Sequence, residues 1–293
     1  MNNFIKSLIE LLKLRITFMV LVTTYLGYYL GIRSVGEYVF TAEQVIILLN
    51  LMIGTFMSAS GANILNQVIE VDNDSKMDRT KNRPIPSGRV KIHHARYLGR
   101  LFCFFGVLYL YFTTNMPTSL VSLSTILLYL YIYTPLKKIS SINTIIGSIP
   151  GALPPLGGWV ASTSTFDAPA WMLFGILFFW QIPHFLAIAI LYANDYKQGG
   201  FKMLPSEFPN SKHTQYHILF FTIALIGASI GLYILKVVGI IYATGSGLLG
   251  LLMLSISMRI IDNNDYINAK KLLLASLIYL PALLLLIILD KVI

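Results

Sequence analysis

Residues 44–66 read QVIILLNLMIGTFMSASGANILN, a run of 23 residues that contains no Asp, Glu, Lys or Arg. A helix of this length extends about 34 Å, which is enough to cross a bilayer hydrocarbon core of roughly 30 Å. Backbone polar groups find no partners in lipid, so a segment that spans the core has to bond internally as a helix. The run therefore predicts a transmembrane helix.

Eight further apolar runs resemble this one, and together they predict an all-α polytopic membrane protein with a bundle of nine transmembrane helices. The expected spans are residues 16–32, 44–66, 97–114, 118–134, 142–163, 169–192, 217–237, 238–258 and 271–289. Only 12% of the residues are charged, whereas soluble domains have roughly 25%. The weakest division lies in 101–134, which only Asn115, Met116 and Pro117 interrupt. We expect a single transmembrane domain over residues 1–293.

The net charge of +9 could indicate a protein that binds nucleic acid, but the positions of the Lys and Arg residues indicate a lipid bilayer instead. Nineteen of the 22 Lys and Arg residues fall in the N-terminus and in alternate loops, all on one side of the nine-span topology. The other side holds Arg33, Lys236 and Lys291. This asymmetry predicts a cytoplasmic N-terminus and, without a cleavable signal or transit sequence, the cell (inner) membrane. The single cysteine, Cys103, excludes an intrachain disulfide.

An acidic cluster follows the second span directly, in the sequence NQVIEVDNDSKMDRTKNRP of residues 66–84. If the helix continues, Asn66, Glu70 and Asp74 lie within about 80° of one another on one face. Carboxylates held so close repel each other, and Mg²⁺ with a substrate phosphate relieves that repulsion with hard oxygen ligands. Asp72 points away from this face and Asp78 lies between the two directions. The cluster predicts a metal site that binds a phosphate.

Basic residues come immediately after these acids. Arg79, Lys81 and Arg83 are placed to neutralise the remaining oxygens of a metal-bound diphosphate. The alternative is a solvated cytoplasmic loop that follows the positive-inside rule. That alternative accounts well for the more distant bases, Arg89, Lys91, Arg96 and Arg100. It accounts poorly for four acids beside a membrane helix, so we favour the diphosphate interpretation for the nearer residues.

A second group of polar residues belongs to the sixth span, where intramembrane polar side chains usually face the interior of a bundle. Gln181, His184 and Asp195 fall within roughly 60° of one face, unless Pro183 bends the helix. His184 has an alternative interpretation as a hydrogen-bonded core histidine. Asp195 is expected on the same side of the membrane as the acidic cluster, which favours a functional role.

Two further features accompany these groups. The fourth span ends on the same side with Tyr133, Lys137 and Lys138. The two lysines either determine the topology or contact the same diphosphate. The fifth span contains an unusual number of helix breakers, which indicates either close helix packing or an irregular wall beside a cavity. These are Gly147, Pro150, Gly151, Pro154, Pro155, Gly157 and Gly158.

With these residues in place, the chain resembles the UbiA superfamily of intramembrane prenyltransferases, and within it the subgroup that farnesylates protoheme IX. The superfamily pattern N-x-x-x-D-x-x-x-D corresponds to Asn66, Glu70 and Asp74. The subgroup's further motifs correspond to KMDRTKNRP (76–84), YTPLKK (133–138), GALPP (151–155), GGW (157–159), WQIPHF (180–185), DY (195–196) and GFKMLP (200–205). The likeness runs from roughly residue 10 to 290 and also implies nine helices.

The resemblance implies a reaction and a set of roles. The farnesyl group of farnesyl diphosphate would pass to a vinyl group of haem b, forming haem O and diphosphate. Mg²⁺ would be held by Asn66, Glu70, Asp74 and Asp195, assisted by Asp78. The implied substrate contacts are Arg79, Lys81, Arg83, Tyr133, Lys137, Lys138, Gln181, His184 and Lys197, with Tyr129 and Tyr133 offering ring faces to a cation. The resemblance leaves open an association with haem A synthase or with terminal oxidase assembly.

Two departures and three rival functions remain. Glu70 stands where the superfamily usually has Asp, and Asp195 is followed at the fourth position by Gly199, so a complete second metal site is in doubt. The rivals are a UbiA enzyme acting on an aromatic quinone precursor, a secondary transporter and a non-catalytic haem-binding assembly factor. A transporter would place its charges at the bilayer midplane, and an assembly factor would not need the carboxylates.

Overall fold

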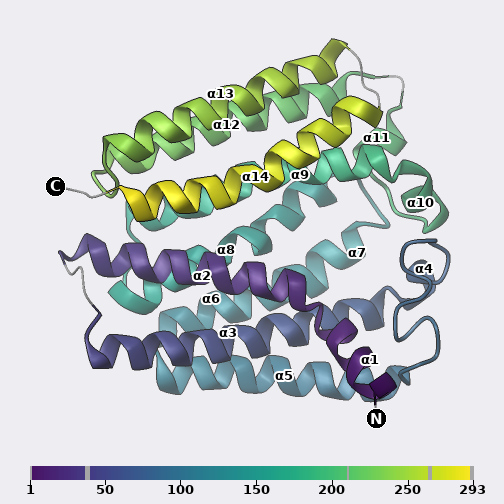
Figure 1. Ribbon diagram of the computed structural model, residues 1–293. Coiled ribbons are helices and arrows are strands. Elements are labelled where there is room, and N and C mark those ends of the chain that lie inside the picture. The colour runs from purple at the N-terminus through teal and green to yellow at the C-terminus, as the bar shows by residue number, and fades with distance from the viewer. Residues whose placement is uncertain (1, 37–39, 210, 263–265, 291–293) are drawn as a thin grey trace.

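The computed structural model describes residues 2–36, 40–209, 211–262 and 266–290, and this part of the chain is helical without a strand (Figure 1). The elements are α1 (Asn2–Leu12), α2 (Leu14–Ser34), α3 (Ala42–Ile69), α4 (Val71–Asp74), α5 (Ile92–Thr113), α6 (Met116–Leu127), the π-helix η1 (Leu128–Tyr133), α7 (Thr134–Leu136), α8 (Asn143–Thr163), α9 (Ala168–Leu191), α10 (Ala193–Gln198), α11 (Leu204–Glu207), α12 (His213–Ile234), α13 (Ile240–Asp262) and α14 (Tyr266–Leu289). Lys291, counted above on the less basic side, lies outside the described residues.

The prediction of an all-helical, multi-span membrane protein is confirmed. Each of the nine predicted spans coincides closely with one long helix or, for 118–134, with the continuous segment α6–η1–α7. Within the described ranges, seven helices are long and apolar enough to cross a membrane, and α5 and α8 are not among them. Histidines and arginines occupy the first turns of α5, and prolines and glycines fill α8, which lowers the mean hydropathy of both. The count of nine is therefore approximate.

The weakest predicted division is a real helix boundary. Helix α5 ends at Thr113, and Asn115 caps the next helix by accepting a hydrogen bond from the backbone N–H of Thr118 at 2.9 Å. Pro117 occupies the first turn of α6, where its missing N–H costs nothing. Two residues, Thr114 and Asn115, suffice for the turn because Asn is a strong N-cap.

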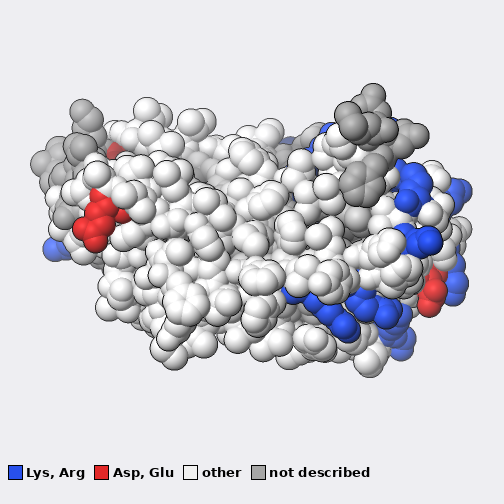
Figure 2. All heavy atoms as spheres, turned by 90° about the horizontal axis from the view of Figure 1, so that it is seen from below, with Lys and Arg blue, Asp and Glu red and all other residues white. Residues whose placement is uncertain are grey.

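The long helices form two groups that meet along α8 and α9. Helices α2, α3, α5, α6 and α8 pack together in one group, and α9, α12, α13 and α14 pack in the other (Figure 1). The short helices α1, α4, α10 and α11 lie together at the right-hand end of Figure 1. Most of the Lys and Arg residues visible in Figure 2 gather at this same end, which we call the basic end.

Helix α8 approaches α2 very closely, and glycine makes this approach feasible. A Cβ on Gly158 would lie 1.9 Å from the carbonyl oxygen of Thr24, and a Cβ on Gly27 would lie 1.8 Å from that of Pro155. Helix α8 runs unbroken from Asn143 to Thr163 despite its prolines. Close helix packing therefore explains Gly158, while Pro154 and Gly157 of the same regular helix line a cavity.

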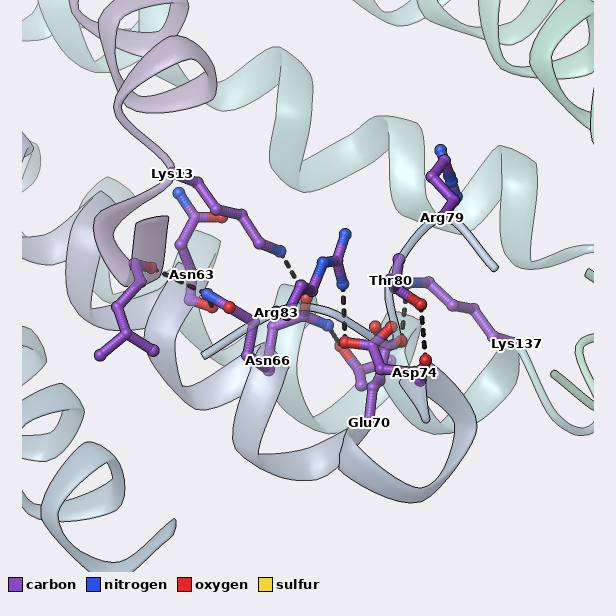
Figure 3. Close-up of polar contacts among 12 residues, drawn as sticks. Lys13, Asn63, Asn66, Glu70, Asp74, Arg79, Thr80, Arg83 and Lys137 are labelled. Carbon is purple, nitrogen blue, oxygen red and sulfur yellow. Dashed lines mark hydrogen bonds and ion pairs between the residues drawn. The ribbon is translucent and has the colours of Figure 1, made fainter. Parts of the chain in front are cut away.

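A short helix precedes the first span, and the sequence did not indicate the break between them. Lys13 separates α1 from α2 with a left-handed backbone conformation, φ 48° and ψ 52°. Non-glycine residues rarely adopt this conformation, and where they do the surrounding structure has to hold them. The break turns the chain sharply at the basic end and directs the Lys13 side chain toward α3 (Figure 3).

Candidate active site

The predicted acidic face exists, and its side chains are buried. Helix α3 ends at Ile69, but helical hydrogen bonding continues, because Glu70 N–H donates to Asn66 O at 3.0 Å and Asp74 N–H to Glu70 O at 2.8 Å. Asn66, Glu70 and Asp74 are 1%, 3% and 1% exposed. Buried carboxylates require compensation by nearby cations or hydrogen-bond donors. The spacing of four residues therefore does bring all three side chains to one place.

Each of these three side chains holds one base from elsewhere in the chain (Figure 3). Lys13 Nζ donates to Asn66 Oδ1 at 3.0 Å, Lys137 Nζ lies 2.7 Å from Glu70 Oε1, and Arg83 Nη1 lies 2.7 Å from Asp74 Oδ2. The bases come from the α1–α2 break, from the end of α7 and from the loop after α4. Three basic side chains thus lie beside three side-chain oxygens in one small site. Such a site suits a polyanionic ligand that binds together with a metal ion, because the bases can contact the anion and the oxygens can contact the metal.

Lys137 lies at the centre of this arrangement. Burial by itself lowers the pKa of the Lys137 ammonium, but the Glu70 carboxylate and the hydroxyls of Tyr133 and Tyr129 outweigh it and raise that pKa above its ordinary value. The ammonium also lies 4.5 Å from the centre of the Tyr133 ring and 5.5 Å from that of Phe201. Lys137 therefore stays charged at neutral pH.

Lys13 is a site residue that sequence reasoning missed. The sequence marks it only as one of the bases near the N-terminus, and nothing in its local sequence relates it to Asn66, 53 positions later. Burial, followed by the nearby Arg83 and Lys137 charges, lowers the pKa of Lys13 to about 7 despite the opposing effect of Glu70. A lysine with this pKa is only partly protonated at neutral pH. A polyanion that binds beside it raises the pKa again, so the lysine becomes fully protonated.

Asp195, on α10, holds the loop that carries the bases. Its Oδ1 accepts a hydrogen bond from the backbone N–H of Asp78 at 2.9 Å, and its Oδ2 lies 3.9 Å from Arg79 Nε. Oδ2 is buried, and it has no hydrogen-bond partner among the described residues. The Arg79 guanidinium lies over the rings of Tyr192 and Tyr196, at 5.1 and 5.4 Å from their centres. An open pocket lies beside these residues.

Other predicted site residues lie away from this centre. The Asp78 carboxylate is 77% exposed and pairs with Lys81, so only the backbone of Asp78 takes part in the contact with Asp195. Lys138 and Lys197 are exposed. Gln181 is buried between α9 and α8, where Nε2 donates to Leu177 O at 3.0 Å and to Ser148 O at 3.4 Å. Its contacts are those of a structural residue.

His184 is half-buried and faces α14, where its Nδ1 lies 2.8 Å from Ser276 Oγ. This contact is consistent with the alternative of a hydrogen-bonded histidine, and it leaves the other ring nitrogen for a further role. The assignment of His184 to a haem contact stays a prediction.

Several polar residues that the sequence did not single out support the site. Thr134 Oγ1 accepts a hydrogen bond from Asn66 Nδ2 at 3.2 Å, and Thr80 Oγ1 donates to Asp74 O at 2.8 Å. Asn73 Nδ2 donates to Gly199 O at 2.6 Å and thus joins α4 to the chain after α10. The Thr134 contact fixes the direction of the Asn66 amide, as a metal ligand requires, and the other two contacts hold the backbone that carries Asp74.

The donor set on the acidic face fits Mg²⁺. Asn66, Glu70 and Asp74 supply one amide and two carboxylate groups, and Mg²⁺ in substrate-phosphate sites is typically bound by one or two carboxylates, with waters and phosphate oxygens completing the shell. No group of three His, Cys, Asp or Glu side chains with ligand spacing occurs in residues 2–36, 40–209, 211–262 and 266–290. Two carboxylates and one amide would leave the rest of a metal shell to waters or phosphate oxygens.

Comparison with known sequences places this chain among prenyltransferases. A sequence profile of the UbiA prenyltransferase family matches residues 20–280. The chain is 36% identical to the protoheme IX farnesyltransferase of Solibacter usitatus (strain Ellin6076) over 98% of this chain and 99% of that protein. It is 39% identical to the protoheme IX farnesyltransferase of Flavobacterium psychrophilum, over 96% of this chain and 93% of that one.

Solved structures share the fold at lower sequence identity. A digeranylgeranylglyceryl phosphate synthase in membranes superimposes with a TM-score of 0.80 at 20% identity, covering 98% of both chains. A UbiA homologue from Archaeoglobus fulgidus bound to GPP and Mg²⁺ superimposes with a TM-score of 0.65 at 13% identity, covering 97% of this chain and all of that one. These likenesses show that the helices are arranged as in UbiA proteins.

Proposed function

We propose, on the premise that this chain belongs to the UbiA prenyltransferase family, that it transfers a farnesyl group from farnesyl diphosphate to a vinyl group of haem b. The products are haem O and diphosphate. The chain is a membrane prenyltransferase, and its near full-length relatives named protoheme IX farnesyltransferase support haem b as the acceptor. The convergence of Lys13, Arg83 and Lys137 on the buried acidic face is the structural observation that carries the proposal.

The acidic face would bind the diphosphate together with Mg²⁺, as supported by the Mg²⁺ and GPP bound to the A. fulgidus homologue. Asn66, Glu70 and Asp74 would hold the metal, and Asp195 offers the unpartnered Oδ2. When bound, Mg²⁺ neutralises the diphosphate and makes it a better leaving group. Lys13, Arg83 and Lys137 would exchange part of their contact with these oxygens for phosphate oxygens and stabilise the charge that grows there.

The bond between C1 of the farnesyl chain and the diphosphate oxygen breaks, and the electron pair leaves with diphosphate. The vinyl π-electrons of haem b then form a bond to C1. Water adds to the resulting cation beside the porphyrin ring and loses a proton, which gives the hydroxyl group of haem O. The stacked rings of Tyr129 and Tyr133, with centres 5.6 Å apart, would stabilise the allylic cation through their faces.

An apolar cavity below the acidic face supports a prenyl substrate. Along α3, the residues one, two and three turns below Asn66 are Ala62, Ser58 and Thr55, and all three line a narrow cavity. Small side chains dominate this wall, so the chain of a prenyl diphosphate would extend from the diphosphate site into the membrane. The same wall would keep water from the allylic cation.

The basic end is proposed to face the cytoplasm in the inner membrane, since bases are retained on that side of bacterial membrane proteins. This places the diphosphate site where the soluble substrate head group arrives. The single-domain organisation over residues 1–293 and an association with haem A synthase or terminal oxidase assembly stay predictions.

The test is an assay in membranes that contain the chain, with haem b, farnesyl diphosphate and Mg²⁺, and with the extracted haems analysed by mass. Asp74→Asn removes a buried ligand charge, and Asp72→Asn, two positions away but exposed, is its matched control. A hydroxyethylfarnesyl haem that requires Mg²⁺, disappears in Asp74→Asn and persists in Asp72→Asn supports the proposal. Prenylation of an added aromatic acid in place of haem would assign the chain to the quinone precursors instead.

A further inference from the structure

The first half of α5 carries two arginines, Arg96 and Arg100, that face outward. Both side chains are exposed, and among the described residues neither forms an ion pair or a hydrogen bond. Arg89, just before α5, differs in this respect because it pairs with Glu10. Residues four apart lie on the same side of a helix, so the two guanidinium groups lie one above the other. They are available to a ligand from outside the chain.

A groove between α5 and the antiparallel segment α6–η1 begins at Arg100. Its volume of about 540 Å³ lies within the range of roughly 300–1,000 Å³ that is typical of ligand sites. On α5 the groove extends from Arg100 to Tyr111, which is about 16 Å along the helix axis, and on α6–η1 it extends from Tyr131 to Ser119. The lining side chains between these ends are apolar. The groove thus has one charged end and a long apolar body.

The groove is open to the outside because α5 directs its small residues toward α3 and its large residues away from the bundle. A Cβ on Gly106 would lie 2.6 Å from the backbone nitrogen of Ser58, so α5 and α3 approach closely on that side. Phe104 and Leu108 line the groove and are 61% and 37% exposed. In a membrane-spanning chain, such side chains face lipid.

The charged end of the groove lies at the basic end of the molecule. Figure 2 views the molecule from the side of α5, where Lys and Arg gather toward the basic end and the surface next to them is uncharged. Tyr131, at the same end of the groove, is 72% exposed, and exposed tyrosines are typical of the headgroup level. The planar guanidinium group of arginine binds phosphate through two hydrogen bonds. The charges therefore lie at the depth of lipid phosphates and the apolar body at the depth of acyl chains.

We propose that the groove between α5 and α6 binds an anionic phospholipid of the surrounding bilayer. Its phosphate lies between Arg96 and Arg100, and one acyl chain lies along Phe104 and Leu108. This site is separate from the acidic face, and the proposal does not depend on the proposed function. Ile126 lines both the groove and the narrow cavity below the acidic face, so a lipid chain in the groove would support the outer side of that wall.

The alternative is that both arginines only determine the topology of the span, as the positive-inside rule requires. Topology requires charge but no groove, whereas a lipid site requires both. The experiment therefore changes the charge and the groove separately.

The first measurement is native mass spectrometry of the purified full chain, released from detergent after titration with phosphatidylglycerol or with phosphatidylcholine. The wild-type chain should retain one phosphatidylglycerol in preference to phosphatidylcholine. Arg96→Gln combined with Arg100→Gln should lower the affinity for phosphatidylglycerol about 30-fold, because each base near an anionic lipid contributes to binding. Lys270→Gln combined with Lys271→Gln is the matched control, since it removes the same charge from exposed positions at the start of α14.

The second pair of variants tests the groove while both arginines remain. Leu123 lines the groove, so Leu123→Trp should fill it and prevent the lipid from binding. Leu120→Trp is the control, because Leu120 is an exposed residue of the same helix that does not line the groove. Phosphatidylglycerol should also raise the unfolding temperature of the wild-type chain and of Leu120→Trp, but not that of Leu123→Trp.

Several results would overturn the proposal. These are wild-type affinity in the double arginine variant, an equal loss in the double lysine variant, wild-type affinity in Leu123→Trp, or equal retention of phosphatidylcholine. Farnesyl diphosphate that displaces the bound lipid would assign the groove to a substrate instead. Circular dichroism in the same detergent identifies a variant that has not folded, and the other variant pair then decides. Since no readout uses farnesyl transfer, failure of this proposal and failure of the proposed function are distinguishable.

Discussion

Lys13 donates a 3.0 Å hydrogen bond to Asn66 from the exact point at which α1 gives way to α2. The left-handed backbone at Lys13 and the inward direction of its side chain are two aspects of one feature, since the turn aims the ammonium at α3. A partly buried lysine with a pKa lowered to about 7 by burial is held there at a cost. Binding of a diphosphate would recover that cost.

Lys13→Met should therefore weaken binding of the prenyl diphosphate. Methionine keeps the length of the side chain and removes the charge, so a charge-assisted contact of about 1.5–3 kcal/mol is lost, or roughly 10- to 100-fold in KM for farnesyl diphosphate. Lys6→Met, on the exposed part of α1, is the control. The measurement is the KM for farnesyl diphosphate from steady-state kinetics in membranes. An unchanged KM in Lys13→Met would show that Lys13 does not contact the diphosphate.

Variants of the buried pair of Lys137 and Glu70 can distinguish an effect on stability from an effect on activity. Their side chains are 13% and 4% exposed, so Lys137→Met leaves a buried carboxylate unpaired, which costs about 3–5 kcal/mol. The double variant Lys137→Met with Glu70→Gln removes both charges and should regain most of that stability but no activity. Thermal unfolding of the detergent-solubilised chain measures the first effect. Activity in the double variant would contradict the role of both residues.

The ring of Tyr133 is expected to matter more than its hydroxyl. Tyr133→Phe keeps the aromatic face beside Lys137 and should retain activity within a few-fold, whereas Tyr133→Leu should lose most of it. The ratio of haem O to free farnesol reports on the allylic cation, because an unstabilised cation is captured by water. Equal activity in both variants would show that the ring face plays no part.

Asp195 and Asp78 should differ although both carry carboxylates at the mouth of the site. Asp195→Asn weakens the contact with Arg79 and loosens the loop that carries Arg83, so activity should fall about 10-fold or more. Asp78→Asn changes a side chain that is 77% exposed and should leave activity nearly intact. Activity assays over a range of Mg²⁺ concentrations compare the two. A greater loss in Asp78→Asn would reverse the assignment.

The contact of α2 with α8 depends on glycine. Gly158→Ala would place a Cβ 1.9 Å from the Thr24 carbonyl oxygen, so two backbones have to separate and the chain should lose about 1–3 kcal/mol or fail to fold. Gly247→Ala, where nothing lies within 4 Å of the added Cβ, should be stable. The comparison of their unfolding temperatures in detergent is the measurement, and equal temperatures would contradict the close approach.

Local pattern predicted a large part of the site. The four-residue spacing of Asn66, Glu70 and Asp74 survives the end of α3 because helical hydrogen bonds continue through Glu70. The same reasoning could not tell that the Asp78 carboxylate points outward, since residue 78 lies beyond the helix where periodicity no longer applies. The substrate contact expected of Gln181 stays a prediction, and in the structure its side chain bridges α9 and α8.

The sequence by itself determined the helices, their approximate ends and the acidic face, because apolar run length and four-residue spacing act within a single helix. Only the tertiary structure decided which bases meet those acids and which residue of α14 contacts His184. Lys13 reaches Asn66 across 53 residues and Ser276 reaches His184 across 92, and such pairs arise from the packing of helices against one another. A charge count distinguishes none of the 22 bases, whereas the structure brings Lys13, Arg83 and Lys137 to the side chains of the acidic face.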